Sequence, residues 1–301
     1  MSVILNAEKE KLKIGFIILH YNTLDVTVQV IEKIQKNIDL LETEYRIIVV
    51  DNASPNKTGK DLAERYKSAG NVIVICNPQN MGFAKGNNIG FQYLKKCYDV
   101  EYIVMMNNDV LLLEQNFYKK LCKAFVDSAF DVAGPLILAG NKRYDVNPVE
   151  YRPHEKEYFE MLLKRCRLEI TLYHFHLHFL WTAVRWLRHL RKTPRATFDY
   201  LTEQTNVKLH GCFWIFSKNY IRDFDGINPN TFMYVEEDIL YTEMMRQNRK
   251  TLYLPNIVVF HFEDAATNSV SRKTREKELF ILREHLKSYQ VLLDIYGSTE
   301  Q

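Results

Sequence analysis

Short apolar runs that end in polar residues alternate with helical periodicity over the first 140 residues of the chain. Continuous apolar runs of this kind predict buried strands at residues 14–19, 45–50, 72–76, 102–106 and 131–138. Helical spacing between them predicts helices at residues 24–40, 59–69 and 114–128, and one opened by the loop 77–90 that runs to about Cys97. This alternation predicts an α/β fold with a mostly parallel sheet and helices on both faces.

Polar residues follow the predicted strands. They include His20–Asn22 after the first strand, Asp51–Asn52 after the second and Asn107–Asp109 after the fourth. In a parallel sheet these ends meet at one rim, where open α/β sheets bind ligands. A carboxylate there can hold a divalent cation against a phosphate, because hard cations prefer oxygen ligands. Ordinary turns would also use Asn and Asp at these places.

The loop after the third strand is rich in glycine and asparagine. Gly82, Gly86 and Gly90 recur at four-residue spacing within residues 77–90. Such glycines let the backbone approach a ligand, and the N-terminus of a helix favours an anion. The spacing matches neither GxGxxG nor a Walker loop, and an ordinary loop-to-helix transition would read similarly.

Residues 140–205 interrupt the alternation and read as a helical insertion, with a helix expected from Tyr158 to Arg191. Residues 170–184 contain no Asp, Glu, Lys or Arg, and residues 164–195 carry a net charge of +7. Basic flanks around an apolar, Trp-containing helix favour a membrane surface with anionic lipid. A buried helical hairpin with a basic face is the alternative. His174 and His178 could share a helix face, but no third ligand is evident nearby, so we do not expect a metal there.

The second half of the chain returns to strand-and-helix patterning. Residues 207–216 predict a strand that contains Gly211, and residues 257–260 predict another that ends at His261. Between them Glu236, Glu237 and Asp238 open an amphipathic helix. Adjacent carboxylates repel one another, which raises the pKa of at least one and suits a general base. Favourable charge at a helix N-terminus would explain the same residues. Residues 272–296 predict a basic amphipathic helix.

Composition narrows the classes of protein. The net charge of +3 over 301 residues does not indicate a nucleic-acid partner, and we expect none. The five cysteines are scattered without a CxxC pair, which favours reduced thiols in the cytoplasm. The N-terminal residues lack the apolar core of a signal peptide, and no stretch has the length of a spanning helix. We therefore expect a soluble protein that at most lies on a membrane.

The motifs together resemble the inverting nucleotide-sugar glycosyltransferases of family two, which have the GT-A fold with its Rossmann-like sheet. They are similar above all to the rhamnosyltransferase-like branch that builds bacterial surface polysaccharides. The matching stretches, in family order, are HYN (20–22), VVDNAS (49–54), NPQNMGFAKGNNIG (77–90), NNDV (107–110), Gly211 with its strand, NTFMYVEED (230–238) and FH (260–261). The resemblance covers roughly residues 13–140 and 205–265.

The resemblance implies a role for individual residues. The expected nucleotide-sugar contacts are Tyr21, Asn22, Asp51, Asn52, Asn80, Gly82, Lys85, Asn88 and Asn108. Asp109 and His261 would hold Mg²⁺ or Mn²⁺ on the diphosphate, with Asn107 standing where many relatives have a further Asp. Asp238 would be the catalytic base, and the doubled Glu leaves Glu237 as the alternative.

The implied activity is transfer of a rhamnosyl or similar hexosyl group, with inversion, from a UDP- or dTDP-linked donor to a glycan or polyprenyl-diphosphate-linked acceptor. Residues 1–139 would bind the nucleotide-sugar and 206–265 would complete the catalytic half. Residues 140–205 would insert between them, with 158–195 on the membrane, and 266–301 would form a C-terminal helix. The expected location is the cytoplasmic face of the cell membrane.

Two other functions fit less of this pattern. A catalytically degenerate, membrane-associated scaffold of a polysaccharide assembly complex would need none of the acidic residues. A sugar-phosphate nucleotidyltransferase normally has a glycine-rich loop with a basic residue after its first strand, and residues 20–26 contain no glycine.

Overall fold

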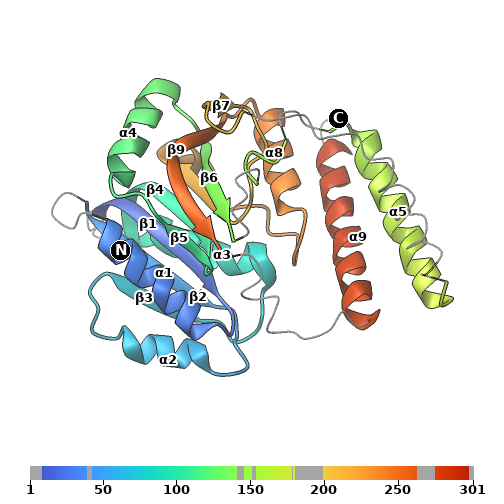
Figure 1. Cartoon of the computed structure of the whole chain (residues 1–301), viewed down its shortest axis with the longest axis horizontal. Coiled ribbons are helices and arrows are strands. Elements are labelled where there is room, and N and C mark those ends of the chain that lie inside the picture. Colours follow the sequence, from blue (N-terminus) through green and yellow to red (C-terminus); the bar gives the residue numbers. More distant parts are fainter. Residues whose placement is uncertain are drawn as a thin grey trace, which may run out of the picture.

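The computed structural model describes residues 9–38, 43–140, 146–150, 154–177, 179, 199–262 and 275–297. Nine strands within this part of the chain form one sheet in the order β3-β2-β1-β4-β8-β6-β9-β5, and β7 pairs with β9 (Figure 1). The strands are β1 (Glu10–His20), β2 (Tyr45–Asp51), β3 (Val72–Cys76), β4 (Tyr98–Asn107), β5 (Val110–Leu112), β6 (Val132–Ala139), β7 (Gln204–Thr205), β8 (Phe213–Ser217) and β9 (Thr251–His261).

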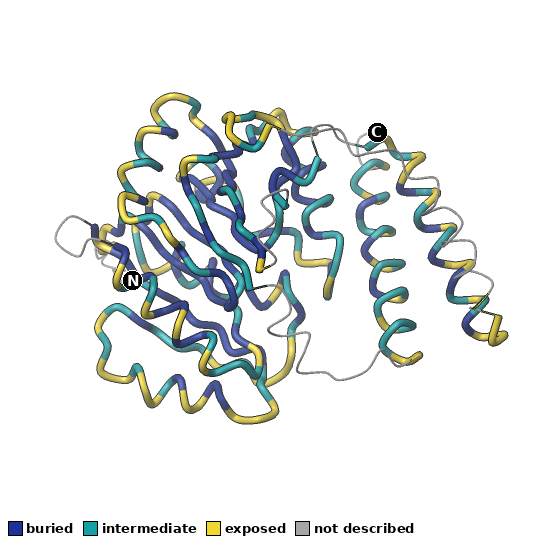
Figure 2. The backbone as a smooth tube through the Cα atoms, in the orientation of Figure 1, coloured by how far each residue is buried: buried dark blue, intermediate teal, exposed yellow. Residues whose placement is uncertain are grey.

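Helices cover both faces of this sheet, and two more form a pair at one end of the molecule. They are α1 (Leu24–Asn37), α2 (Thr58–Arg65), α3 (Gly82–Cys97), α4 (Phe117–Ser128), α5 (Lys156–His174), α7 (Lys218–Asp223), α8 (Glu236–Arg246) and α9 (Arg275–Gly297). Apolar side chains of α1, α2 and α4 pack on one face, and those of α3, α7 and α8 pack on the other. Strand residues alternate between these two cores, as a pleated strand buried on both sides requires, and the buried segments lie along the sheet in Figure 2.

The N-terminal half of the sheet is parallel, as the sequence pattern predicts. β1 lies between β2 and β4, and its register places His20 beside Asp51 and Leu19 beside Asn107. The polar residues that follow these strands therefore share one rim, which confirms the arrangement expected from their positions in the sequence.

The C-terminal half of the sheet is mixed. β8 runs antiparallel to both β4 and β6, and β9 is parallel to β6 but antiparallel to β5. The strand predicted over residues 207–216 is shorter than expected and begins at Phe213. Lys208 instead forms an isolated bridge with Glu150, because the chain turns at Gly211 before it enters the sheet.

α5 and α9 form an antiparallel pair at one end of the molecule, beside α8 (Figure 1). Tyr296 donates its hydroxyl to the carbonyl of His154, and Arg275 donates to the carbonyl of Tyr173. The helical stretch expected from Tyr158 to Arg191 is interrupted, because α5 ends at His174. His176 then takes a positive φ of 59°, which an α-helix does not accommodate. Residues 178 and 180–198 lie outside the described residues.

Candidate active site

Asp109 and His261 come together at the rim of the sheet. Asp109 directly precedes β5 and His261 ends β9, and these two strands pair with Val110 opposite His261. Nε2 of His261 lies 3.2 Å from Oδ1 of Asp109. Asp109 is buried, and neither its Oδ1 nor Nδ1 of His261 has a hydrogen-bond partner among the described residues. Two buried polar atoms are therefore available to a ligand.

This pair fits a divalent cation. Two neighbouring ligands of an octahedral Mg²⁺ lie about 3 Å apart, since each bond is about 2.1 Å. The observed Asp109–His261 separation matches that distance. The part of the chain that the structure describes contains no group of three His, Cys, Asp or Glu side chains able to hold a metal. Mg²⁺ is commonly held by one or two carboxylates and completes its shell with water and substrate phosphate, so Asp109 alone could hold it, whereas the imidazole of His261 is a ligand that suits a transition metal ion.

Glu237 lines a cavity of about 390 Å³, together with Glu236, Asp238 and His210. Its Oε1 accepts a hydrogen bond of 2.5 Å from the backbone N–H of Gly211 and lies 3.6 Å from Nδ1 of His210. The imidazole of His210 is in turn 6.0 Å from that of His261, measured between ring centroids. The chain thus brings an acidic residue of α8 and the Asp109–His261 pair to one site, connected by His210.

The sequence did not identify His210 as a site residue. A single histidine beside an apolar strand is an ordinary feature, and only its position next to Gly211 hinted at the site. Its contacts with Glu237 and His261 join segments far apart in the chain, so they depend on the sheet topology.

Asp238 is placed differently from Glu237, although the two are adjacent. Its Oδ1 lies 2.8 Å from Nζ of the buried Lys208, which also lies 2.8 Å from Oε2 of Glu150. Burial raises the pKa of Asp238 above its ordinary value, although the ammonium of Lys208 opposes the shift. Glu236, the first acid of the three, is buried and accepts a hydrogen bond of 2.9 Å from the hydroxyl of Thr231.

The segment before α8 has an unusual backbone. Tyr234 and Val235 both have positive φ, at 75° and 71°. Two consecutive side-chain-bearing residues in this region are costly, and such strain is commonly kept at functional sites. The turn sets the direction in which α8 leaves the rim and therefore where its acidic first turn lies.

Asp51 and Asn52 organise the rim at the end of β2. Asp51 is buried, and its Oδ1 accepts hydrogen bonds from the backbone N–H and the hydroxyl of Ser54. Nδ2 of Asn52 donates to Oδ1 of Asn80 and to the carbonyl of Gly82, and its Oδ1 accepts from the backbone N–H of Met81. Asn52 and Asn80 therefore hold the loop that precedes α3.

Gly82 requires its residue type. Its φ is +78°, and a Cβ there would lie 2.2 Å from the carbonyl oxygen of Phe232. That carbonyl accepts a hydrogen bond of 2.7 Å from the backbone N–H of Phe83. The close approach joins the N-terminus of α3 to the segment that leads into α8.

The other residues expected on the nucleotide side lie around β1. Tyr21 is exposed at the rim, and Asn22 has a positive φ and a buried Oδ1 without a hydrogen-bond partner among the described residues. Nδ2 of Asn108 donates to the hydroxyls of Thr23 and Thr27. These contacts place Asn108 in the support of the rim.

His20 belongs to the same support. Its two ring nitrogens form hydrogen bonds with the hydroxyls of Thr27, at 2.7 Å, and Thr58, at 2.9 Å. Burial lowers the pKa of His20, although the carboxylate of Asp51 opposes the shift. The imidazole is therefore neutral at physiological pH, and it fixes α1 and α2 against β1.

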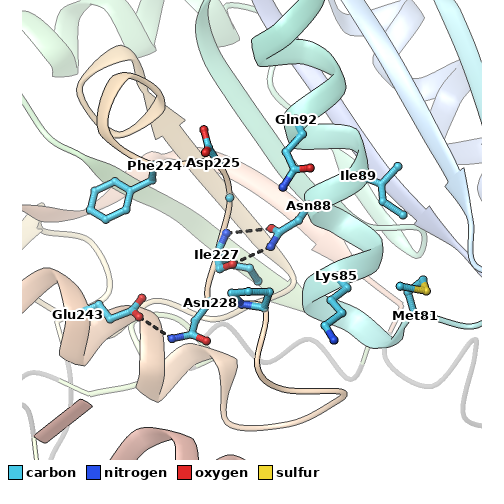
Figure 3. A pocket seen from close by; sticks show the side chains of 12 residues that line it. Met81, Lys85, Asn88, Ile89, Gln92, Phe224, Asp225, Ile227, Asn228 and Glu243 are labelled. Carbon is cyan, nitrogen blue, oxygen red and sulfur yellow. Dashed lines mark hydrogen bonds between the residues drawn. The ribbon is translucent and has the colours of Figure 1, made fainter. Parts of the chain in front are cut away.

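Lys85 and Asn88 lie on α3, beside a second cavity of about 490 Å³ (Figure 3). The amide of Asn88 is engaged at both ends, because it donates to the carbonyl of Ile227 and accepts from its backbone N–H. Lys85 is exposed at this cavity, which also borders Glu243 of α8. These two expected donor contacts therefore border a cavity other than the one lined by Glu237.

The family follows from the sequence match together with this geometry. A family model described as Glycosyl transferase family 2 matches residues 16–223. The chain belongs to glycosyl transferase family 2. Among curated proteins, this family 2 chain is 30% identical over 115 residues to the dTDP-rhamnosyl transferase RfbF of Shigella flexneri. That alignment covers 36% of each protein, so the chain matches about a third of the relative's length.

Solved structures show the fold. TarS residues 1–349 of S. aureus in complex with UDP-GlcNAc superposes with a TM-score of 0.52 at 15% identity, covering 90% of this family 2 chain and 64% of TarS. GalNAc-T7 with UDP, GalNAc and Mn²⁺ gives a TM-score of 0.55 at 13% identity, covering 91% of this chain and 48% of the other. Both are GT-A glycosyltransferases, which confirms the predicted fold class.

Proposed function

We propose that the protein transfers a rhamnosyl or similar hexosyl group, with inversion, from a UDP- or dTDP-linked donor to a glycan or lipid-linked acceptor. One observation carries this proposal: Glu237 lies beside the Asp109–His261 pair, with His210 between them. The similarity to a dTDP-rhamnosyl transferase supports the donor class. The UDP-GlcNAc bound to the structurally similar TarS is consistent with a nucleotide-sugar.

The two sides of the site would divide the work. A Mg²⁺ or Mn²⁺ ion held by Asp109 and His261 would neutralise the charge that develops on the departing diphosphate. Glu237 would remove the proton of the acceptor hydroxyl as that oxygen attacks the anomeric carbon. A single base without a protein nucleophile gives one displacement, and one displacement inverts the anomeric configuration.

Glu237 suits the role of base better than Asp238. Nζ of the buried Lys208 lies 2.8 Å from Oδ1 of Asp238 and stabilises the charged form of that carboxylate, which makes it a weaker base. Glu237 lines the same cavity as Asp238 and is about 30% exposed, and its Oε1 accepts from the uncharged backbone N–H of Gly211. Asp238 would then orient the first turn of α8.

Asp51, Tyr21 and Asn22 would bind the nucleotide. They lie at the end of the parallel strands, where α/β sheets bind nucleotides, and Asn22 has an acceptor atom available. Asn52, Asn80 and Gly82 would act through the loop that they hold.

The α5 helix would carry the protein to the membrane. Met161 and Leu168 lie seven residues apart on one side of α5, Phe175 follows directly after the end of the helix, and each of the three is about half exposed or more. Lys164 and Arg167 lie on the same helix. No helix in the described part of the chain has the length and apolarity needed to cross a membrane. A peripheral position on the cytoplasmic face would present the site to lipid-linked acceptors.

The decisive experiment is a panel of dTDP- and UDP-sugars, including dTDP-rhamnose, assayed for nucleotide release with Mn²⁺ or Mg²⁺ and again with EDTA. We expect one donor to turn over only with metal, and Asp109→Ala to abolish that turnover. Thermal melting of the variant would control for folding. Silence across the panel, together with no binding of UDP or dTDP by calorimetry, would refute the transferase and favour a scaffold.

A further inference from the structure

The cavity beside Glu237 has a wall that comes from the C-terminal helix. His285 and Tyr289 of α9 line this cavity together with Tyr234. The family match ends at residue 223, and the sequence motifs end at His261, so neither assigns a role to α9. The helix nevertheless contributes to the same cavity as the proposed base.

α9 is firmly attached at this point. The imidazole of His285 stacks on the ring of Tyr234, with centroids 4.7 Å apart and planes within 9° of parallel. The ring of Tyr289 follows at 5.9 Å from His285. Ser288, between them on the helix, is buried and donates its hydroxyl to the carbonyl of Met233. The aromatic wall is therefore built before any ligand arrives.

The wall offers a ligand polar atoms on His285 and Tyr289. Nδ1 of His285 donates to the carbonyl of Ile281 at 2.9 Å, so Nε2 is the ring nitrogen left for a ligand. Burial raises the pKa of Tyr289, and its hydroxyl therefore stays protonated and can donate. Aromatic bodies with a few fixed polar atoms are typical of small-molecule sites, and they suit a sugar ring with its C–H faces and hydroxyl groups.

The position of the α9 wall indicates that it contacts the acceptor and not the donor. In a single displacement the attacking hydroxyl and the leaving diphosphate lie on opposite faces of the transferred sugar. The Asp109–His261 pair would hold the diphosphate side, and Glu237 must face the attacking hydroxyl. The α9 wall belongs to the Glu237 cavity, whereas Asp51 and Asn22 on the nucleotide side do not line it.

We propose that Tyr234, His285 and Tyr289 form the acceptor subsite, which binds a carbohydrate ring and directs its hydroxyl to Glu237. This inference rests on the proposed transferase function. It makes α9 a determinant of acceptor specificity, and it assigns the acceptor to the carbohydrate class at the point of attack even where a lipid carries it.

The test uses the full chain with the donor that turns over and p-nitrophenyl glycosides of glucose, galactose, N-acetylglucosamine and rhamnose as acceptor probes. We expect at least one glycoside to raise nucleotide release. We expect His285→Gln and Tyr289→Phe each to raise the KM for that glycoside about tenfold or more, with the Kd for UDP or dTDP unchanged within twofold. Arg283→Ala is the matched control, because Arg283 is exposed on the same helix, and its KM should stay within twofold.

The outcomes separate this inference from the function on which it rests. A wild type that neither binds nucleotide nor turns over a donor refutes the transferase itself. A wild type that turns over a donor but responds to no glycoside overturns the carbohydrate subsite. So does an unchanged glycoside KM in both α9 variants, or a KM change matched by weaker nucleotide binding, which would place α9 on the donor side.

Discussion

Nζ of Lys208 lies 2.8 Å from Oδ1 of Asp238, so this acid of α8 is held in an ion pair, whereas the adjacent Glu237 accepts a hydrogen bond from the backbone N–H of Gly211. Removing one partner of a buried pair leaves a charge without compensation. We expect Lys208→Met to lower the free energy of unfolding by about 3 kcal/mol, near the lower limit for such pairs because Glu150 keeps some access to solvent. Urea denaturation measures this loss.

The matched control is Lys67→Ala. Lys67 lies 3.7 Å from Glu64 in an exposed pair, where a change of at most about 1 kcal/mol is expected. Equal losses in the two variants would show that the Lys208 contacts contribute no more than a surface pair.

Glu237→Gln should remove the base and keep the shape of the site. We expect kcat to fall by about 10²- to 10⁴-fold, the usual contribution of a general base, while the Kd for UDP or dTDP is retained. Asp238→Asn should reduce kcat less, because Asp238 acts through the position of α8. Steady-state kinetics of both variants decide between them, and the opposite order of losses would make Asp238 the base.

Asn88→Ala should act on stability. The amide of Asn88 satisfies both backbone groups of Ile227, and the loss of a buried partner leaves donors and acceptors unpaired. We expect a loss of about 1–3 kcal/mol in the free energy of unfolding, with little change in the KM for the donor. Gln92→Ala, on the same helix and beside the same cavity, is the control and should be near neutral. A raised KM for the donor with an unchanged free energy of unfolding would instead show that Asn88 contacts the donor.

Replacement of Met161, Leu168 and Phe175 by serine should weaken membrane binding. Met161 and Leu168 share one exposed side of α5 and Phe175 follows its last residue, and transfer of these side chains into lipid would contribute apolar burial. We expect binding to vesicles of phosphatidylglycerol and phosphatidylcholine to fall about tenfold or more in a sedimentation assay. Val126→Ser on α4, which removes an even more exposed apolar side chain elsewhere, should leave binding unchanged. Equal binding by the triple variant and wild type would exclude α5 as the contact.

Local sequence patterns were enough to predict the parallel half of the sheet. Each of the first strands is a buried apolar run, and parallel pairing alone places Asp51 and Asp109 at one rim. The short β5 was missed because three residues have no measurable periodicity. The antiparallel entry of β8 between β4 and β6 depends on long-range pairing that no window of sequence contains.

The candidate site likewise combines residues that the sequence identified with contacts that it could not reveal. Asp109, His261 and Glu237 are polar residues at the ends or beginnings of elements, so their positions in the sequence singled them out. The pairing of Asp238 with Lys208 joins residues 30 apart, and the stack of Tyr234 on His285 joins residues 51 apart. Such contacts follow from how α8 and α9 pack, so neighbouring residues in the chain could not reveal them.

The antiparallel pairing of α5 with α9 links two segments that the chain separates by about a hundred residues. A small apolar cluster of Phe159, Ile239 and Leu292 joins them to α8, independently of the two cores on the sheet. α5 and α9 can therefore be treated as one structural unit. Exchange of both helices together between relatives should carry acceptor choice and membrane attachment with it and leave the donor half intact, whereas exchange of either helix alone would mismatch the cluster.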